Sequence, residues 1–270
     1  MDSLNFKNYL ELCRRLGIRY VSARTPEKNE TVSEPKPETV STAPKPGLVS
    51  TMLESVKISE IPSLATLEGP KWLSASDRTD RAKRLMAFDA SICQCQKCPL
   101  GKTRNHFVFG SGNPEARVLF VGEAPGADED AQGLPFVGKA GQLLTKIIES
   151  TKAFKREDVF IANVLKCRPP GNRTPQPEEV EQCRPYLEEQ IKIIQPLLIM
   201  ALGASAAQAL LKTKDAVGKL RNRWHDYGGI PLRVTYHPAA LLRFEGYKKD
   251  VWEDMKEFTA KYQEFPQNQQ

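Results

Sequence analysis

The sequence predicts a three-layer α/β/α protein, in which helices cover both faces of a central, mostly parallel four-stranded sheet. Short apolar runs alternate with longer helical patterns along most of the chain. The runs are apolar throughout, and Gly or Pro ends or closely follows each of them. Strands of this kind, buried on both faces and separated by helices, are typical of a parallel sheet.

The N-terminal part of the chain is expected to lie outside this domain. Residues 1–20 have apolar side chains at spacings of three and four, which predicts an amphipathic helix. Residues 21–75 are rich in Pro, Ser, Thr, Glu and Lys, and they cannot bury enough apolar area to offset the entropy lost on ordering. We therefore expect a disordered tether at 21–75 and one folded domain at 76–265.

Within the domain, a leading helix is followed by four strand–helix pairs. The predicted strands are 118–122, 159–165, 196–203 and 232–238, and the predicted helices are 76–95, 141–151, 177–194, 204–211 and 247–263. Ligands of such folds bind beyond the carboxyl ends of the strands. We therefore expect the site to include Glu123 after the first strand, Asn163 near the end of the second and His237 after the last.

Composition narrows the class of protein only slightly. The 270 residues include 39 Lys and Arg against 33 Asp and Glu, a net charge of +6, which fits a polyanionic partner without identifying one. No run reaches the roughly 20 apolar residues of a membrane span. The N-terminus also lacks a basic segment followed by an apolar block. We expect a cytoplasmic protein with no membrane association.

The six cysteines point to metal ligands or free thiols, because disulfides are rare in cytoplasmic proteins. Cys95 and Cys98 form a C-x2-C pair, while Cys167 and Cys183 belong to the second strand–helix unit. Four converging thiolates bind zinc or an iron–sulfur cluster, and spacing does not separate these metals. Alternatively, Cys167 and Cys183 are buried as small hydrophobic residues, and Cys93 joins the C-x2-C pair in a local metal or redox site.

The turn after the first predicted strand is a poor phosphate cradle. Asp128, Glu129 and Asp130 would repel a phosphate, and no Lys followed by Ser or Thr stands where a phosphate-binding loop needs it. We therefore expect a ligand other than a nucleoside triphosphate.

Several separated blocks, in order, carry a more specific signal. They are C-Q-K-C-P-L-G-K-T-R, F-G-S-G-N-P-E-A, V-G-E-A-P-G-A-D-E-D, G-L-P-F-V-G-K-A-G, N-V-L-K-C-R-P-P-G-N-R-T-P, E-Q-C-R-P-Y-L and Y-H-P-A-A-L-L. Over roughly residues 90 to 260 this pattern resembles the family 4 uracil-DNA glycosylases, base-excision repair enzymes of bacteria and archaea. The resemblance implies that the protein flips uracil out of DNA and hydrolyses its N-glycosidic bond, leaving an abasic site. It also implies a structural [4Fe-4S] cluster on Cys95, Cys98, Cys167 and Cys183.

The resemblance assigns roles around the uracil ring. Phe136 matches the aromatic residue that stacks on the base, its alternative being ordinary core packing. Asn163 presents a donor and an acceptor that match uracil N3–H and O4, its alternative being a cap at the strand end. His237 would donate an N–H to O2 as negative charge develops on the leaving base. Gly122 and Ala124 are expected to line the same pocket.

The carboxylate that positions water is less well defined by the pattern. Better-studied uracil glycosylases have G-Q-D-P-Y-H where this chain has G-E-A-P-G-A, so their catalytic Asp is replaced by Ala124. Glu123 is the nearest carboxylate able to orient water or stabilise the cationic sugar. Glu129 and Asp130 are the alternatives, and both residues are otherwise expected to be solvated charges near a helix start.

Further residues are expected to contact DNA, with either single or double strands as substrate. Leu241 falls where the superfamily inserts an apolar wedge, although it could equally cover the core, and Arg243 is placed for a phosphate. The loops 168–173 and 219–225 are rich in Arg and would form a basic rim.

Two other functions compete with hydrolysis. A covalently trapping uracil-DNA binding protein would need a nucleophilic His in the loop K-C-R-P-P-G-N-R-T-P, which contains none. A non-catalytic accessory domain for a replication protein would not need Glu123, Phe136, Asn163 and His237 together. The helix at 1–20 is nevertheless a candidate for recruiting a replication or repair partner to a chain expected to be monomeric.

Overall fold

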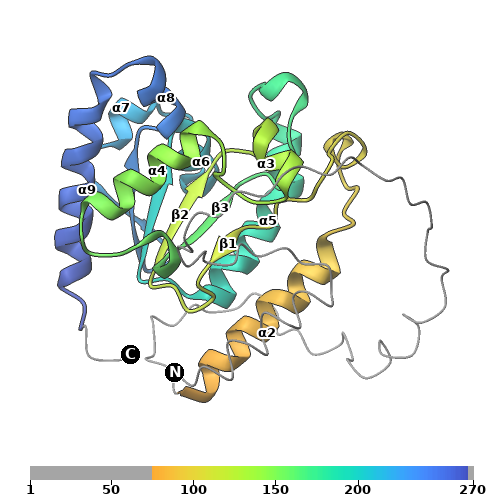
Figure 1. The fold of residues 1–270 in the computed structure, drawn as a ribbon, viewed down its shortest axis with the longest axis horizontal. Helices are drawn as coiled ribbons and strands as arrows, with labels where there is room; N and C mark the ends of the chain where they lie inside the picture. Colours follow the sequence, from red (N-terminus) through yellow and green to blue (C-terminus); the bar gives the residue numbers. More distant parts are fainter. Residues whose placement is uncertain (1–74, 267–270) are drawn as a thin grey trace, which may run out of the picture. The chain divides into compact units, whose positions relative to one another are not determined.

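The computed structural model describes residues 75–266 (Figure 1). The helix expected at 1–20 and the tether expected at 21–75 lie outside these residues, except for Ala75, which begins the first described helix. Both therefore stay predictions, as does the domain division built on them.

Six strands within the described range form one sheet, in the order β1-β3-β2-β4-β6-β5. Their bounds are β1 Ser111–Gly112, β2 Val118–Gly122, β3 Phe160–Asn163, β4 Leu198–Leu202, β5 Trp224–Tyr227 and β6 Ile230–Thr235. The four predicted strands are the four parallel ones, so the fold class is confirmed. Two antiparallel edge strands, β1 and β5, extend the sheet beyond the prediction.

Helices cover both faces of the sheet (Figure 1). The α-helices are α2 Ala75–Ile92, α3 Ala127–Gln132, α4 Lys139–Ser150, α5 Pro177–Ile194, α6 Ala204–Leu211, α7 Val217–Leu220, α8 Pro238–Arg243 and α9 Tyr247–Gln263. The 3-10 turns are η2 Pro99–Lys102, η3 Arg156–Asp158 and η4 Pro170–Asn172. Buried side chains of α2, α5 and α6 share one core, and those of α4, α8 and α9 share the other.

Strand β2 shows why the apolar runs are continuous. Leu119 and Val121 belong to the core under α2, α5 and α6, whereas Val118 and Phe120 belong to the core under α4, α8 and α9. Successive side chains point to opposite faces of a sheet, so a strand covered on both faces needs an apolar residue at every position.

The parallel register brings the ends of β2 and β3 together. Gly122 lies opposite Asn163 across the two strands. Pairing continues past the strand ends, because the Val164 N–H donates to the Gly122 carbonyl (2.9 Å) and the Leu165 N–H to the Glu123 carbonyl (3.0 Å). The residues that the sequence placed after different strands therefore meet at one edge of the sheet.

A buried ion network joins α9 to β6 and to the residue that follows α7. The Asp254 carboxylate, fully buried, accepts from Arg221 Nε (2.7 Å) and from the Thr235 hydroxyl (2.7 Å). Arg233 Nη2 lies 3.6 Å from the other carboxylate oxygen, and both guanidinium groups are buried. Asp254 is thus the buried counter-charge that two buried cations share, and each cation has a second, more exposed partner: Glu257 for Arg233 (2.7 Å) and Asp250 for Arg221 (3.2 Å).

Asp254→Ala is expected to lower the free energy of unfolding by about 3–5 kcal/mol, because both buried guanidinium groups lose their buried counter-charge and keep only the half-exposed Glu257 and Asp250. Glu253→Ala, on the same helix, is the matched control. Its pair with Lys256 is about half exposed on both sides (49%/49%) and contributes about 1 kcal/mol or less. Urea unfolding of both variants measures the difference, and equal losses would contradict the network's importance.

Candidate active site

Four residues from separate segments converge beyond the carboxyl ends of β2, β3 and β6. The rings of Phe136 and His237 lie 5.5 Å apart between centroids, tilted by 33°. A Cβ added to Gly122 would lie 2.5 Å from Phe136 Cζ and would also overlap the Asn163 side-chain oxygen. We call Gly122, Phe136, Asn163 and His237 the strand-end cluster. The structure therefore brings together the main residues that the sequence predicted for the site.

Asn163 is buried with an unsatisfied acceptor. Its side chain is 2% exposed, and no donor within residues 75–266 bonds its Oδ1 atom. An unpaired buried acceptor costs about 1–3 kcal/mol. A cap on the strand end would use this oxygen, whereas a ligand that supplies an N–H would satisfy it.

His237 is held in one tautomer by the helix that it begins. As N-cap of α8, its Nδ1 atom accepts from the Ala239 N–H (3.1 Å). The proton of the neutral ring is therefore on Nε2. Burial lowers the pKa of His237 to about 4, and the positive charge of Arg243 contributes in the same direction. At neutral pH the ring is an uncharged donor through Nε2.

A carboxylate shapes the loop that presents Phe136. This residue adopts a left-handed backbone conformation (φ 54°), which is uncommon for a bulky side chain. Glu129 accepts from the backbone N–H groups of Gly126 (3.0 Å), Val137 (3.0 Å) and Gly138 (3.1 Å), and so closes the loop on both sides of Phe136. Glu129 is a loop-forming residue, a role the sequence analysis did not assign to it.

Asp130 also has a structural role. Its side chain is 2% exposed. It accepts from the backbone N–H and side-chain amide of Asn105 (2.9 and 2.7 Å) and from the His106 N–H (3.3 Å). The expectation of a solvated charge is wrong for this residue, because the approaching 105–106 segment encloses it.

Glu123 is the third candidate carboxylate and the one that the sequence analysis favoured. It is half-buried after β2, and Ser205, in the first turn of α6, donates a short hydrogen bond to its Oε2 atom. This bond fixes the carboxylate from the β4–α6 unit, whose strand lies beside β2 in the sheet. Ala124 is also half-buried and packs against the core under α2, α5 and α6.

Helix α8 does not place Leu241 as predicted. Leu241 is 2% exposed and packs in the core under α4, α8 and α9, which does not agree with an inserted wedge. Leu242 and Phe244 are 52% and 58% exposed instead. Arg243 is exposed beside them. The physical reason is the helical turn, which directs Leu241 inward and its neighbours outward.

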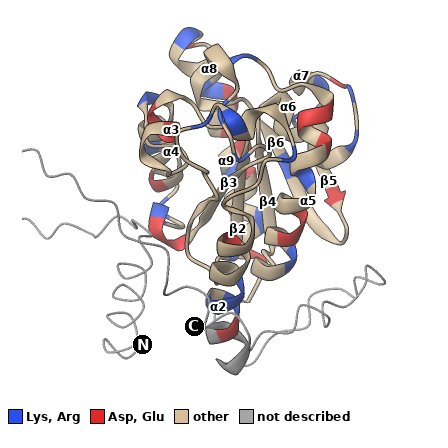
Figure 2. Ribbon diagram, turned by 90° about the vertical axis from the view of Figure 1, so that its right-hand side faces the viewer, with Lys and Arg blue, Asp and Glu red and all other residues tan. Residues whose placement is uncertain are grey.

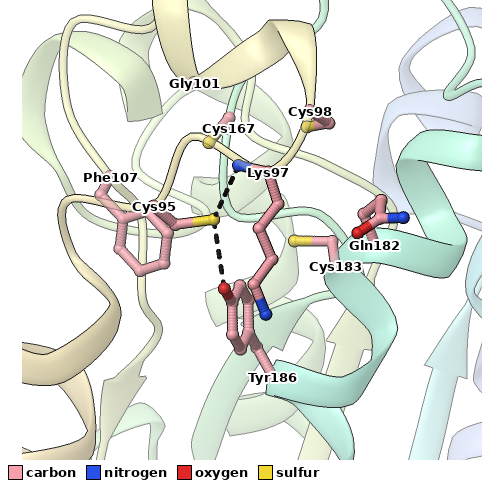
Figure 3. A pocket seen from close by; sticks show the side chains of 9 residues that line it. All are labelled: Cys95, Lys97, Cys98, Gly101, Phe107, Cys167, Gln182, Cys183 and Tyr186. Carbon is pink, nitrogen blue, oxygen red and sulfur yellow. Dashed lines mark hydrogen bonds between the residues drawn. The ribbon is translucent and has the colours of Figure 1, made fainter.

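A second group of residues forms a cavity next to the sheet (Figure 3). Cys95 and Cys98 follow α2, Cys167 follows β3, and Cys183 lies on α5. These four thiols line the cavity together with Lys97, Gly101, Phe107, Gln182 and Tyr186. The structure thus joins the two pairs of cysteines, whereas Cys93 does not line the cavity.

Hydrogen-bond donors surround the sulfur atoms. Tyr186 donates its hydroxyl to Cys95 Sγ (3.2 Å), and Arg104 donates Nη1 to Cys167 Sγ (3.3 Å). The backbone N–H of Lys166 donates to Cys183 Sγ (3.3 Å). Burial raises the pKa of the Cys183 thiol to about 12. A thiolate at this position therefore requires a bound cationic centre, as metal coordination supplies.

The four cysteines are loosely arranged around the cavity. Within residues 75–266, no three His, Cys, Asp or Glu side chains lie close enough to hold one metal ion. A tetrahedral zinc site would need such closely spaced thiolates. An iron–sulfur cluster is larger, because several irons and sulfides lie between its cysteine ligands.

The fold and the strand-end cluster define a class of protein in which an aromatic ring, an amide and an imidazole meet at the carboxyl ends of a parallel sheet. Residues 109–256 match the family model described as the Uracil DNA glycosylase superfamily. This match includes β2 to β6 and all four members of the strand-end cluster.

Curated relatives narrow the class. A type-4 uracil-DNA glycosylase of Saccharolobus solfataricus is 45% identical over 173 residues, which cover 61% of this chain and 80% of the relative. The type-4 uracil-DNA glycosylase of Pyrobaculum aerophilum is 46% identical over 178 residues, which cover 62% of this chain and 89% of the relative. The type-4 uracil-DNA glycosylase of Thermotoga maritima is 47% identical over 154 residues, which cover 56% of this chain and 80% of the relative. The chain belongs to the type-4 uracil-DNA glycosylase family.

Proposed function

We propose that this protein is a DNA repair enzyme that hydrolyses the N-glycosidic bond between uracil and deoxyribose in DNA and leaves an abasic site. One observation supports it most strongly. The strand-end cluster combines an aromatic ring, a buried amide oxygen that lacks a donor and an imidazole with its proton on Nε2. These three groups match the face, the N3–H edge and the O2 atom of uracil.

Base recognition depends on Phe136 and Asn163. The aromatic ring stacks on a base that has left the helix, a contact worth about 1–3 kcal/mol. Asn163 Oδ1 accepts from uracil N3–H, and the amide nitrogen donates to O4. Cytosine has an acceptor at N3 and a donor at N4, so it would leave buried groups on both sides unpaired.

Bond cleavage depends on His237 and Glu123. As the C1′–N1 bond breaks, its electron pair moves to uracil N1, and the negative charge spreads to O2. His237 donates Nε2–H to that oxygen and stabilises the anion. Glu123, fixed by Ser205, orients the water whose hydroxyl bonds to C1′. The proton from this water balances the charge on the released uracil.

The exposed end of α8 is placed to contact DNA. Basic residues lie at this end of the helix in Figure 2, and Arg243 is free of the core to bind a phosphate. We assign the wedge that fills the space of the extruded base to Leu242 rather than Leu241, because Leu242 is 52% exposed. In the loop 168–173, the Arg173 guanidinium already forms two bonds with Glu179 (2.6 and 2.9 Å).

We also propose that the four cysteines of the cavity ligate a structural [4Fe-4S] cluster. When bound, this group supplies a rigid crosslink between the segment after α2, the turn after β3 and helix α5, and the hydrolysis needs no redox step. Anaerobically purified protein is expected to contain about four irons per chain, with sulfide in equal amount. Cys183→Ser should lose most of this iron and Cys93→Ser should keep it. Equal retention in both variants would contradict the assignment.

The remaining expectations concern location and assembly. Within residues 75–266, no helix is long and apolar enough to cross a membrane. A cytoplasmic location, a monomeric state and a replication partner for the N-terminal helix stay predictions.

Mass spectrometry of the released bases tests the proposed reaction. Oligonucleotides that carry U, T or C at one otherwise identical position are incubated with the protein, both as single strands and as duplexes. Free uracil is expected from the U substrates and no free cytosine from the C substrates, because cytosine reverses the donor and acceptor that the amide pairs with. Thymine has the same edge as uracil, so the T substrates test separately whether the pocket excludes the 5-methyl group. Absence of free uracil from both strand forms would overturn the proposal.

Gly122→Ala is expected to slow uracil release by about 100-fold or more, because its Cβ would displace the Phe136 ring and the Asn163 amide. Gly218→Ala is the matched control, since a Cβ there has nothing within 4 Å. Single-turnover rates measure the effect. Similar rates for both variants would show that the strand-end cluster does not hold the base.

A further inference from the structure

Lys166 is a fully buried ammonium that the proposed reaction does not use. Its side chain is 0% exposed. Nζ donates to the backbone carbonyl of Asn163 (2.7 Å) and to Oε1 of Gln190 (2.6 Å). Gln190 is also 0% exposed, and its Nε2 atom donates to the Phe109 carbonyl (2.9 Å). The ammonium thus links β3 to helix α5 through two short hydrogen bonds.

The backbone of Lys166 is fixed to the cysteine cavity. Its N–H donates to Cys183 Sγ (3.3 Å), and its carbonyl accepts from the Val108 N–H (2.8 Å). The next residue along the chain is Cys167, which lines the same cavity. The segment from Asn163 to Cys167 therefore connects the strand-end cluster to the thiols. Within this segment, the Lys166 side chain bonds the Asn163 carbonyl, and the Lys166 backbone N–H bonds a thiol of the cavity.

A role in filling space alone does not explain these contacts. Both hydrogen-bond acceptors of Nζ are neutral, so burying the charge is costly, and the nearby Asp89 carboxylate acts on it without a hydrogen bond. Methionine has a similar length and would fill the volume without this cost. What methionine could not provide is the bond to the Asn163 carbonyl, which fixes the backbone from which the recognition amide projects.

We propose that Lys166 is a positioning residue for Asn163. Through its hydrogen bonds, the position of the cysteine-bearing segments determines the position of the Asn163 backbone in the uracil pocket. This inference rests on the proposed function. Lys166 does not touch the base. It restricts the peptide of Asn163, so that the side-chain amide meets N3–H and O4 at the same time, and a misplacement of about 1 Å is enough to lose much of the rate.

Lys166→Met tests the proposal by separating the uracil pocket from DNA binding. The inhibition constant of free uracil is expected to rise about 10-fold, and single-turnover excision to slow by about 10- to 100-fold. Binding of uracil-free DNA should be unchanged. All values are compared at matched iron content, with circular dichroism as a check on folding.

Lys97→Met is the matched control, since it makes the same substitution beside the same cavity. The Lys97 side chain lies over the Tyr186 ring (5.0 Å), and its backbone N–H, which bonds Cys95 Sγ, is kept. Its uracil inhibition constant should equal that of the wild type. If both Lys variants raise the constant equally, a general charge effect at the cavity replaces the positioning role.

A double-mutant cycle makes the coupling explicit. In an Asn163→Ala background, Lys166→Met should slow excision by no more than about threefold, because no amide remains to be positioned. If the two substitutions slow excision independently, so that the fold-change of the double variant is the product of the two single fold-changes, the proposal is overturned. If Lys166→Met does not fold, Gln190→Met repeats the cycle, since it removes one acceptor of Nζ and should give a smaller effect of the same sign. A wild-type protein that releases no uracil would instead refute the proposed function.

Discussion

His237→Ala is expected to slow single-turnover release of uracil by about 100- to 1,000-fold, the largest effect of any single substitution considered. The reason is geometric. Nδ1 is already occupied by the Ala239 N–H, so the proton of the neutral ring lies on Nε2, the atom to which the proposed function assigns the bond to uracil O2. Without this donor the anion loses a stabilising bond that strengthens as the C1′–N1 bond breaks.

Two variants separate catalysis from helix capping. His237→Asn keeps an oxygen able to accept from Ala239 N–H, as asparagine does at many helix N-termini, yet it lacks the reach of Nε2. It should fold like the wild type and remain slow. His225→Ala removes a ring of the expected basic rim, whose Nε2 bonds the Leu220 carbonyl (2.8 Å), and should excise at the normal rate once the protein saturates the DNA. Normal excision by His237→Asn would contradict the assigned role.

The charge state of His237 makes a further prediction about pH. Burial lowers the pKa of His237 from 6.5 to about 4, so the unfolded chain binds a proton between these values and the folded chain does not. Stability supplied by the neutral ring is therefore complete above pH 6.5 and declines as the pH falls toward 4. Ring ¹⁵N NMR should show a neutral Nε2–H tautomer at pH 6, and an imidazolium at that pH would refute it.

Asn163→Ala is expected to reduce uracil release by about 100-fold or more. Two base hydrogen bonds are lost, and each leaves a buried group unpaired at a cost of about 1–3 kcal/mol. The inhibition constant of free uracil should rise as well, because the amide acts on the base and not on the DNA backbone. Single-turnover rates and uracil inhibition measure both effects.

Asn113→Ala is the control for this substitution. The Asn113 side chain accepts from the local Glu115 N–H (2.9 Å) in the turn before β2, at the amino end of the strand, and the substitution keeps the residue's backbone hydrogen bonds. Its loss should leave excision and uracil inhibition unchanged. An Asn163→Ala variant that behaves like this control would show that recognition of uracil lies elsewhere.

The parallel core of the fold could be predicted because its signal is local. Every position of β2 is buried, so the apolar run at 118–122 is continuous, and helices α5, α6 and α9 have the bounds that their periodicity predicted. The edge strands gave no such signal. Strand β1 has two residues, and the polar β5 is half-exposed, so neither forms an apolar run.

The site was predictable where residues follow strand ends, and less so where roles depend on contacts distant in sequence. Glu129 had a readable signal, since an acidic residue three positions after Gly126 is typical of a capping box. The burial of Lys166 depends on Gln190, 24 residues away, and no local pattern shows it. Whether Leu241 or Leu242 points outward depends on how α8 packs against its neighbours.

The central claim is that one enzyme recognises uracil and hydrolyses its bond to DNA. It is tested most directly by incubating the purified protein, in EDTA, with a labelled oligonucleotide that contains a single U, followed by alkali and a denaturing gel. We predict a strand break at the U that appears only after alkali, and that is lost or strongly slowed with Asn163→Ala and His237→Ala. An intact strand, or a strand that migrates as a protein adduct, would contradict hydrolysis and the roles of Glu123 and His237.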